Sequence, residues 1–415
     1  MARSDSGFSP PQTGNTGKRH LRVLGSVALL ALAFAPGASW ALFSDRVELW
    51  AAENVTHDSN VFRLSPSRDP RSIGVLKLSD TISTTSLGAT LDLPVSQQRL
   101  QAAYTWFASR YRDFSDLNFN GHAARAAWLW SVQQTLTGTA SYTESQGLAS
   151  FSNIQNRTPD LVATRQALFS AAWLATPRWR ASGSITATQQ KHGDLARRVN
   201  DIEAASTEVG LSYITPQDNS FGGVVRVERG RLPHGTSLLG APFDNAYTHR
   251  GAGATMTWSV TGHSRFDGRV EWVRRTYEQV TQRNFDGATA RATYTWTPTG
   301  KLTILTAAQR DIAPIQDINA LFVLLTGASV RPRWALSDKL TLQGTLEYNV
   351  WDYRGDPLTG ANWTHRVRTE GVSALYRPTQ KILLQGGLLH EARSSTLLYG
   401  DYVVNVVFVE GRIGF

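Results

Sequence analysis

Residues 288–297 read ATARATYTWT, and this stretch decides the fold class. Its even-numbered positions are Ala, Ala, Ala, Tyr and Trp, whereas its odd-numbered positions are Thr, Arg, Thr, Thr and Thr. Successive side chains of a β-strand point to opposite faces, so this alternation predicts a strand with one apolar and one polar face. Residues 178–187 and 340–350 repeat the pattern. Each alternating segment is about ten residues long, which suits a tilted crossing of a bilayer.

Connections of two kinds separate the alternating segments. Short turns, several of them marked by proline, occur near Pro94, Pro177, Pro216, Pro298 and Pro378. Longer polar stretches such as residues 191–201, 231–245 and 354–362 lie between them. Proline cannot donate a hydrogen bond to a strand ladder, so it marks strand ends. We therefore predict an all-β fold, a transmembrane antiparallel up-and-down β-barrel of about 18 strands (16 to 18), with short periplasmic turns and long extracellular loops.

Aromatic side chains stand beside the short turns of nearly every predicted hairpin. They are Trp128, Trp130, Trp173, Trp179, Tyr213, Phe221, Trp258, Phe266, Trp296, Trp334 and Tyr376. The core of a soluble sandwich would also collect aromatic residues on strands. It would not place them at one end of the hairpins, whereas a girdle at a membrane surface does so.

The two ends of the chain carry the marks of export. A basic segment ending at Arg22, an apolar run at residues 23–35 and the small-residue pattern at 39–41 predict a signal peptide over residues 1–41. The barrel domain then covers residues 42–415. The last predicted strand ends at Phe415, and a terminal phenylalanine on an alternating strand resembles the assembly signal of bacterial outer-membrane barrels.

Several classes of site are disfavoured by the sequence. The chain has no cysteine, so it has no disulfide, thiolate metal site or lipid-modified cysteine. Its formal charge of +9 is dispersed among 42 basic and 33 acidic residues, which disfavours nucleic acid as a partner. Residues 116–121 copy the start of a calcium loop, but Ala127 stands where a glutamate is needed. We predict no catalytic residue, no metal site and no cofactor.

Charged residues opposite the apolar faces are the candidates for the lining of a lumen. They are Arg125, Arg180, Arg226, Arg265, Arg269, Arg291, Glu271 and Glu347. A mixed charged wall is expected of any water-filled barrel. The excess of arginine favours anionic, hydroxyl-rich solutes, because guanidinium binds carboxylate in a planar fork. Trp351 and Tyr353 are candidates for stacking on sugar faces.

The first mature segment carries a family resemblance. Residues 44–49 read SDRVEL and residues 54–65 read NVTHDSNVFRLS. This segment resembles the EpsL family of outer-membrane barrels, which accompany the exosortase and PEP-CTERM sorting system in exopolysaccharide loci. The resemblance implies a role in exopolysaccharide biosynthesis or export. A simpler interpretation of residues 58–62 is a strand-end turn that orders the first loop.

Three functions follow from these observations. The first is a non-enzymatic channel or accessory pore for secreted polysaccharide in the outer membrane of a Gram-negative bacterium. The alternative is a general or nutrient-uptake porin, and a third function is a barrel-embedded hydrolase. The expected partners are outer-membrane lipid and lipopolysaccharide, exopolysaccharide, the barrel-assembly machinery and periplasmic export components.

Overall fold

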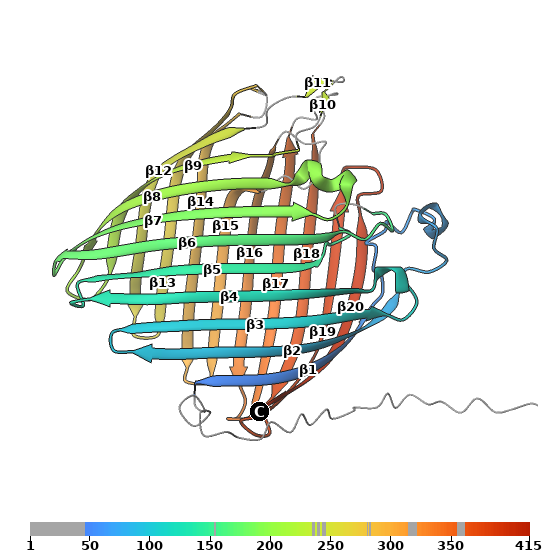
Figure 1. Ribbon diagram of the computed structural model, residues 1–415, viewed down its shortest axis with the longest axis horizontal. Coiled ribbons are helices and arrows are strands. Elements are labelled where there is room, and N and C mark those ends of the chain that lie inside the picture. The colour runs from blue at the N-terminus through green and yellow to red at the C-terminus, as the bar shows by residue number, and fades with distance from the viewer. Residues whose placement is uncertain are drawn as a thin grey trace, which may run out of the picture. The chain divides into compact units, whose positions relative to one another are not determined.

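The fold is a sheet of 18 long strands that accounts for most of the chain (Figure 1). The computed structural model describes residues 46–152, 155–234, 237–238, 241–242, 246–279, 281, 284–313, 322–354 and 362–415, and the predicted signal peptide lies outside them. The long strands are β1 (Val47–Asp58), β2 (Asp80–Val95), β3 (Gln98–Tyr111), β4 (Phe119–Val132), β5 (Leu136–Leu148), β6 (Leu161–Thr176), β7 (Trp179–His192), β8 (Ile202–Ile214), β9 (Ser220–Arg231), β12 (Tyr247–Thr261), β13 (Ser264–Tyr277), β14 (Phe285–Thr299), β15 (Leu302–Ala313), β16 (Phe322–Ala335), β17 (Leu340–Arg354), β18 (Trp363–Tyr376), β19 (Ile382–Ser395) and β20 (Tyr402–Gly414).

The smaller elements lie in the connections between these strands. They are the two-residue strands β10 (Ser237–Leu238) and β11 (Ala241–Pro242) and the 3-10 helices η1 (Pro70–Ile73), η2 (Ser115–Leu117) and η3 (Leu195–Asn200). Within the described ranges, no helix is both long enough and apolar enough to cross a membrane.

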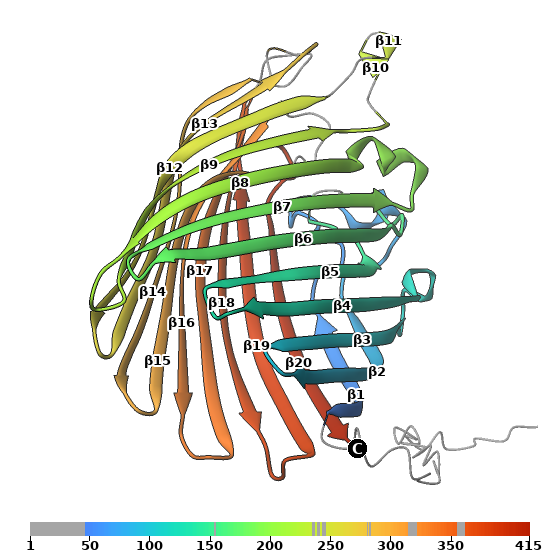
Figure 2. The ribbon, with the colours of Figure 1, turned by 60° about the vertical axis from the view of Figure 1, so that its left-hand side comes forward.

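The sheet closes on itself. Each long strand pairs antiparallel with the next along the chain, β9 pairs with β12 across the β10–β11 hairpin, and β20 returns to pair with β1. Figure 2 shows the blue β1 beside the red β20. The barrel therefore has no open edge, and each long strand has a hydrogen-bonded neighbour on both sides. The predicted antiparallel barrel of about 18 strands is confirmed.

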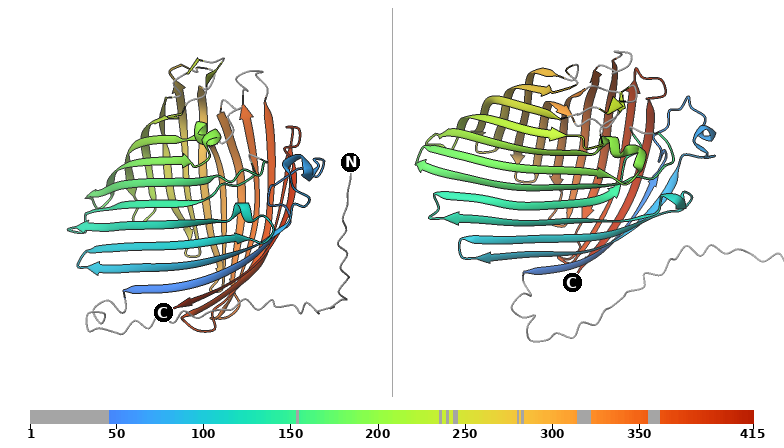
Figure 3. Two further views of the ribbon diagram at one scale, coloured as in Figure 1. Left: turned by 45° about the vertical axis from the view of Figure 1, so that its right-hand side comes forward. Right: turned by 45° about the horizontal axis from the view of Figure 1, so that its top comes forward.

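Short and long connections alternate around the barrel. β6 and β7 are joined by two residues, whereas 21 residues separate β1 from β2. Both the start of β1 and the end of β20 lie at the end of the barrel that carries the short turns (Figure 3). Two prolines differ from the prediction, because Pro94 lies inside β2 and Pro298 inside β14. The β2–β3 turn is made instead by Ser96, whose φ of 54° is left-handed, and Gln97.

One face of the wall is apolar and faces outward. Register places Val270 and Trp272 of β13 beside Ala290 and Ala288 of β14, and the first two side chains are 58% and 63% exposed. All of the aromatic residues predicted for the girdle lie on this outer face. Exposed apolar surface on this scale requires lipid, and in a bilayer only a closed barrel satisfies the backbone of a sheet.

The segment behind the family resemblance forms a latch at the long-loop end of the β1–β20 seam. Asn60 Nδ2 donates to the carbonyl oxygens of Leu64 at 2.8 Å and Val403 at 3.2 Å, and Asn60 Oδ1 accepts from the Leu64 N–H at 2.9 Å. Arg63, with a left-handed φ of 53°, pairs with Asp58 at 2.8 Å. These bonds fasten the start of the first loop to the last strand, so the motif has a structural role.

The latch continues into an apolar cluster formed by three loops. Phe62 is fully buried, and its ring lies 4.9 Å from the ring of Phe114 and 5.2 Å from that of Phe151. Beside this cluster Arg157 pairs with Asp116 at 2.6 Å and lowers the pKa of the Asp116 carboxyl by hydrogen bonding. The residues that copy a calcium loop therefore bind an arginine.

We predict that Asn60→Ala destabilises the barrel by at least about 2 kcal/mol, because it leaves buried backbone groups of residue 64 without partners. The measurement is urea unfolding of the protein folded into vesicles, followed by tryptophan fluorescence. Asn120→Ala is the matched control, since that exposed amide accepts one bond from Arg110 and should change the free energy of unfolding by less than about 0.5 kcal/mol. Equal stability of the two variants would contradict the latch.

Candidate functional site

The polar face of the wall encloses the lumen, and register places the predicted lumen residues on it. Arg265, Arg269 and Glu271 alternate with the outward Phe266, Val270 and Trp272 along β13. Register also places the other predicted charges on the inner face: Arg125 on β4, Arg180 on β7, Arg226 on β9, Arg291 on β14 and Glu347 on β17.

The structure brings three of these residues together in a charge ladder. Arg269 binds Glu271 at 2.7 Å on its own strand and Glu208 of β8 at 2.6 Å. Arg226 of β9 lies 4.0 Å from Glu271 and 3.0 Å from the Nε2 atom of His249. The ladder thus crosses β8, β9, β12 and β13, and it places two carboxylates against two arginines.

Glycines on β12 make room for this ladder. A Cβ atom on Gly253 would lie 2.0 Å from the Val270 carbonyl oxygen and 2.7 Å from the Glu271 Cα atom. A Cβ atom on Gly251 would lie 3.2 Å from the Glu271 Oε1 atom. Without side chains at these two positions, the Glu271 carboxylate can lie across β12 and approach Arg226.

Most of the other predicted lumen charges also have partners. Arg265 binds Asp267 at 2.9 Å, Arg291 binds Asp311, and Glu347 binds Arg331 at 2.9 Å. Arg125 and Arg180 differ, because both are exposed and neither forms an ion pair within the described residues. Among the predicted lumen arginines, these two are the ones without an ion pair in the described part of the chain, so the predicted excess of unneutralised guanidinium is smaller than the sequence suggests.

The predicted stacking residues lie at the long-loop end of the inner face. Tyr353 is only 4% exposed, and its ring stacks on Trp363 at 5.2 Å with an interplanar angle of 13°. The ring of His365 packs against the Tyr353 ring in an edge-to-face arrangement, with 4.9 Å between the ring centroids. The prediction for Tyr353 needs correction, because this ring is packed into the wall. Trp351 is partly buried against the same cluster, and its role in stacking stays a prediction.

The inner wall also contains a hydroxyl-lined alcove that was not predicted from the sequence. Thr139, Ser170 and Ser184 are register partners across β5, β6 and β7, and the row ends at Glu208 of β8. Together with neighbouring wall residues they line a hollow of about 470 Å³. Threonine and serine at every second position of residues 137–143 and 182–188 are the sequence signal that could have revealed it.

A comparison with protein families agrees with this architecture over part of the chain. A family model described as "Putative beta-barrel porin 2" matches residues 245–415, which is less than half of the chain. Comparison with curated proteins finds no match.

Solved structures with a similar fold include outer-membrane proteins of three bacteria. Pseudomonas aeruginosa OccK1 (OpdK) covers 89% of this chain over 99% of its own length, with 10% identity and a TM-score of 0.48. A BenF-like porin from Pseudomonas fluorescens gives 10% identity, 89% and 98% coverage and a TM-score of 0.48. Acinetobacter baumannii OccAB3 gives 9% identity, 89% and 98% coverage and a TM-score of 0.45. Identities this low transfer no ligand to this chain.

The chain is a porin-like β-barrel of the bacterial outer membrane. Its own wall carries this conclusion, since the sheet is closed, apolar outside and polar inside, and the porin family model agrees with it.

We predict that Glu271→Gln destabilises the barrel by about 3 kcal/mol, because it leaves two neighbouring arginines short of a partner in a nearly buried site, where Glu271 is 6% exposed. Asp267→Asn removes a lumen carboxylate from the same strand, but its pair with Arg265 is exposed and should contribute less than about 1 kcal/mol. Urea unfolding in vesicles measures both variants. A smaller loss for Glu271→Gln than for Asp267→Asn would contradict the importance of the ladder.

Proposed function

We propose that the protein is a water-filled channel through which small hydrophilic solutes cross the outer membrane by diffusion. The observation that carries this proposal is the closed wall of 18 strands with an inner face lined by charged and hydroxyl side chains. Eight strands give an interior that side chains can fill, whereas barrels of 16 to 18 strands leave an aqueous channel. The porin description of the matching family supports the same function.

The solutes that fit the inner wall best are small anions that carry hydroxyl groups. Arg125 of β4 and Arg180 of β7 are exposed arginines on strands that also line the hydroxyl-lined alcove, which spans β4 to β8. Serine and threonine hydroxyls both donate and accept hydrogen bonds, so they can replace water around a solute hydroxyl. The two guanidinium groups would attract the negative charge of the same solute. The role that we propose is transport without catalysis.

A part in exopolysaccharide export is the second candidate function. It rests on the resemblance of residues 44–65 to the EpsL family. The most specific part of that segment, residues 58–64, forms the latch between β1 and β20, so its side chains are used in contacts within the protein. The wall itself favours a porin, and uptake of a small solute is the first function to test.

We predict that the purified protein conducts ions in planar bilayers and that Arg125→Gln with Arg180→Gln lowers its preference for anions. A unit charge about 10 Å from a permeating ion in water contributes about 0.4 kcal/mol, favourable for an anion and unfavourable for a cation, so the loss of each arginine should reduce the anion-to-cation permeability ratio by up to about fourfold at low salt. The reversal potential in a salt gradient measures this ratio.

The matched control removes two arginines from the outer face. Arg366→Gln with Arg368→Gln changes the net charge of the protein equally, but both side chains point away from the lumen. This control should leave the permeability ratio unchanged. Bilayers that stay silent, or equal shifts in the two double variants, would contradict the proposed channel. A deletion strain that keeps solute uptake but loses secreted polysaccharide would favour the second candidate.

A further inference from the structure

The outer face of β5 to β9 changes from apolar to charged within two rows of side chains. Phe169, Ile185 and Val227 belong to one row of register partners, which also contains Thr207 and reaches Arg250 of β12. The next row on the outer face lies two residues nearer the long loops along each strand, and it consists mainly of small side chains. The row after it lies two residues nearer the loops again, and it contains Arg165, Gln189, Glu203 and Arg231. Such a boundary marks where the hydrocarbon of the outer leaflet ends and its headgroups begin.

Three arginines meet on the outer face at the edge of this boundary. Arg250 of β12 is the direct register partner of Arg274 of β13, and Arg229 of β9 is its diagonal neighbour on the other side. Within the described residues Arg229 and Arg250 form no ion pair, and Arg274 only approaches Asp286 at 4.0 Å. Like charges directly opposite one another destabilise a sheet, so this patch favours an external anion.

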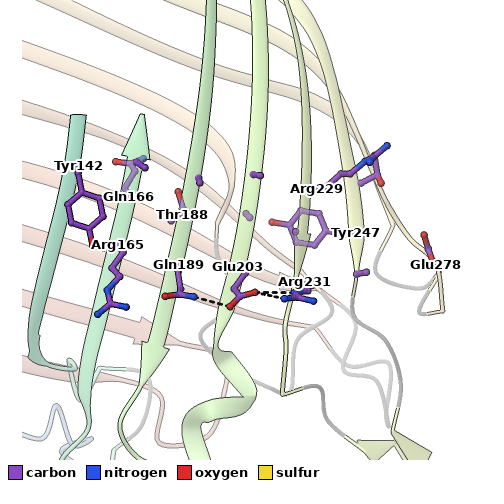
Figure 4. A pocket seen from close by; sticks show the side chains of 17 residues that line it. Tyr142, Arg165, Gln166, Thr188, Gln189, Glu203, Arg229, Arg231, Tyr247 and Glu278 are labelled. Atoms are coloured by element: carbon purple, nitrogen blue, oxygen red, sulfur yellow. Dashed lines mark hydrogen bonds and ion pairs between the residues drawn. The ribbon is translucent and has the colours of Figure 1, made fainter. Parts of the chain in front are cut away.

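A groove runs along the outer wall beside the patch. Its floor is the row of small side chains, Ala167, Ala187 and Ala205, which are register partners on β6, β7 and β8, and the row continues to Arg229. The groove has a volume of about 770 Å³. Figure 4 shows Tyr142 on one side of the groove and Arg229 and Arg231 toward the opposite side.

The charged rim of the groove is partly neutralised within the protein. Glu203 accepts hydrogen bonds from Gln189 at 2.9 Å and from Arg231 at 2.8 Å, shown as dashed lines in Figure 4. Arg165 binds Glu144 at 3.0 Å on the side of Tyr142. Glu278 also reaches the groove. The positive charge available to a ligand is therefore concentrated at Arg229 and Arg250.

We propose that this patch and groove bind a phosphorylated, multiply acylated lipid of the outer leaflet, the lipid A part of lipopolysaccharide. A phosphate would be held by Arg229, Arg250 and Arg274, because guanidinium groups bind phosphate oxygens in pairs. The sugar body would lie in the alanine-floored groove, whose floor offers no bulky side chain.

The acyl chains of the lipid would lie over the apolar row below the groove. Phe169, Ile185 and Val227 are 49%, 57% and 40% exposed in the absence of lipid. The lipid would thus bind the arginines through its phosphate and cover the neighbouring apolar side chains with its acyl chains. This inference concerns the outside of the wall, so it stands independently of what crosses the lumen.

The test measures binding of lipid A to the purified barrel in detergent by native mass spectrometry, with the same lipid lacking its phosphates as a second probe. We expect Arg229→Gln with Arg250→Gln to weaken lipid A binding at least tenfold and to leave the weaker binding of the dephosphorylated lipid unchanged. Ala187→Trp fills the groove without changing charge, and it should weaken binding of both lipids.

Arg310→Gln with Arg366→Gln is the matched control, since both arginines lie on the outer face of other strands. It should bind lipid A as tightly as the unchanged protein. Equal losses in the two double variants, no loss in Arg229→Gln with Arg250→Gln, or equal binding of both lipids by the unchanged protein would overturn the proposal. Full competition by millimolar inorganic phosphate would also overturn it, because the site would then recognise the free anion. Each variant is first checked for the heat-dependent gel shift of a folded barrel.

Discussion

The constraint on which the structure depends is that no backbone group may stay unpaired in the hydrocarbon layer. The pairing of β1 with β20, from Trp50 opposite Gly414 to Asp58 opposite Val406, satisfies it for the two strands that would otherwise be edges. The Asn60 amide extends this seam past the end of β1 by binding the carbonyl of Val403. Closure therefore depends on strands that are separated by nearly the whole chain.

Closure also explains why the lumen can hold so many charged groups. The inner wall faces water, yet the ladder built around Arg269 and Glu271 brings oppositely charged groups from three strands into close contact. Such pairing keeps the wall polar while it limits the net field inside the channel. The selectivity of the lumen then depends on the few charges that remain unpaired. On the outer face, the unpaired Arg229 and Arg250 are likewise the charges available to a ligand.

The sequence predicts the faces of this fold better than it predicts contacts between side chains. The alternation at residues 288–297 correctly gives the inner and outer faces of β14, because the period of two is a local property of a strand. The bond from Arg269 to Glu208 joins residues 61 positions apart, and the approach of Glu271 to Arg226 requires the room left by Gly251 and Gly253. Tyr353 was placed on the correct face, but its burial depends on Trp363, the partner that register sets beside it. Long-range register and the size of neighbouring side chains are not readable from a local pattern.

Cysteine scanning along β14 tests the central claim most directly, since the chain has no cysteine of its own. Single cysteines would replace residues 288 to 295 in turn in the protein folded into lipid vesicles. A membrane-impermeant, water-soluble thiol reagent should label the odd positions from Arg291 to Thr295, which are not buried as Thr289 is. The even positions, Ala290 and Ala292 among them, should react only with a lipid-soluble maleimide. Uniform labelling by the water-soluble reagent, or preferential labelling of the even positions, would contradict a wall with lipid on one side and water on the other.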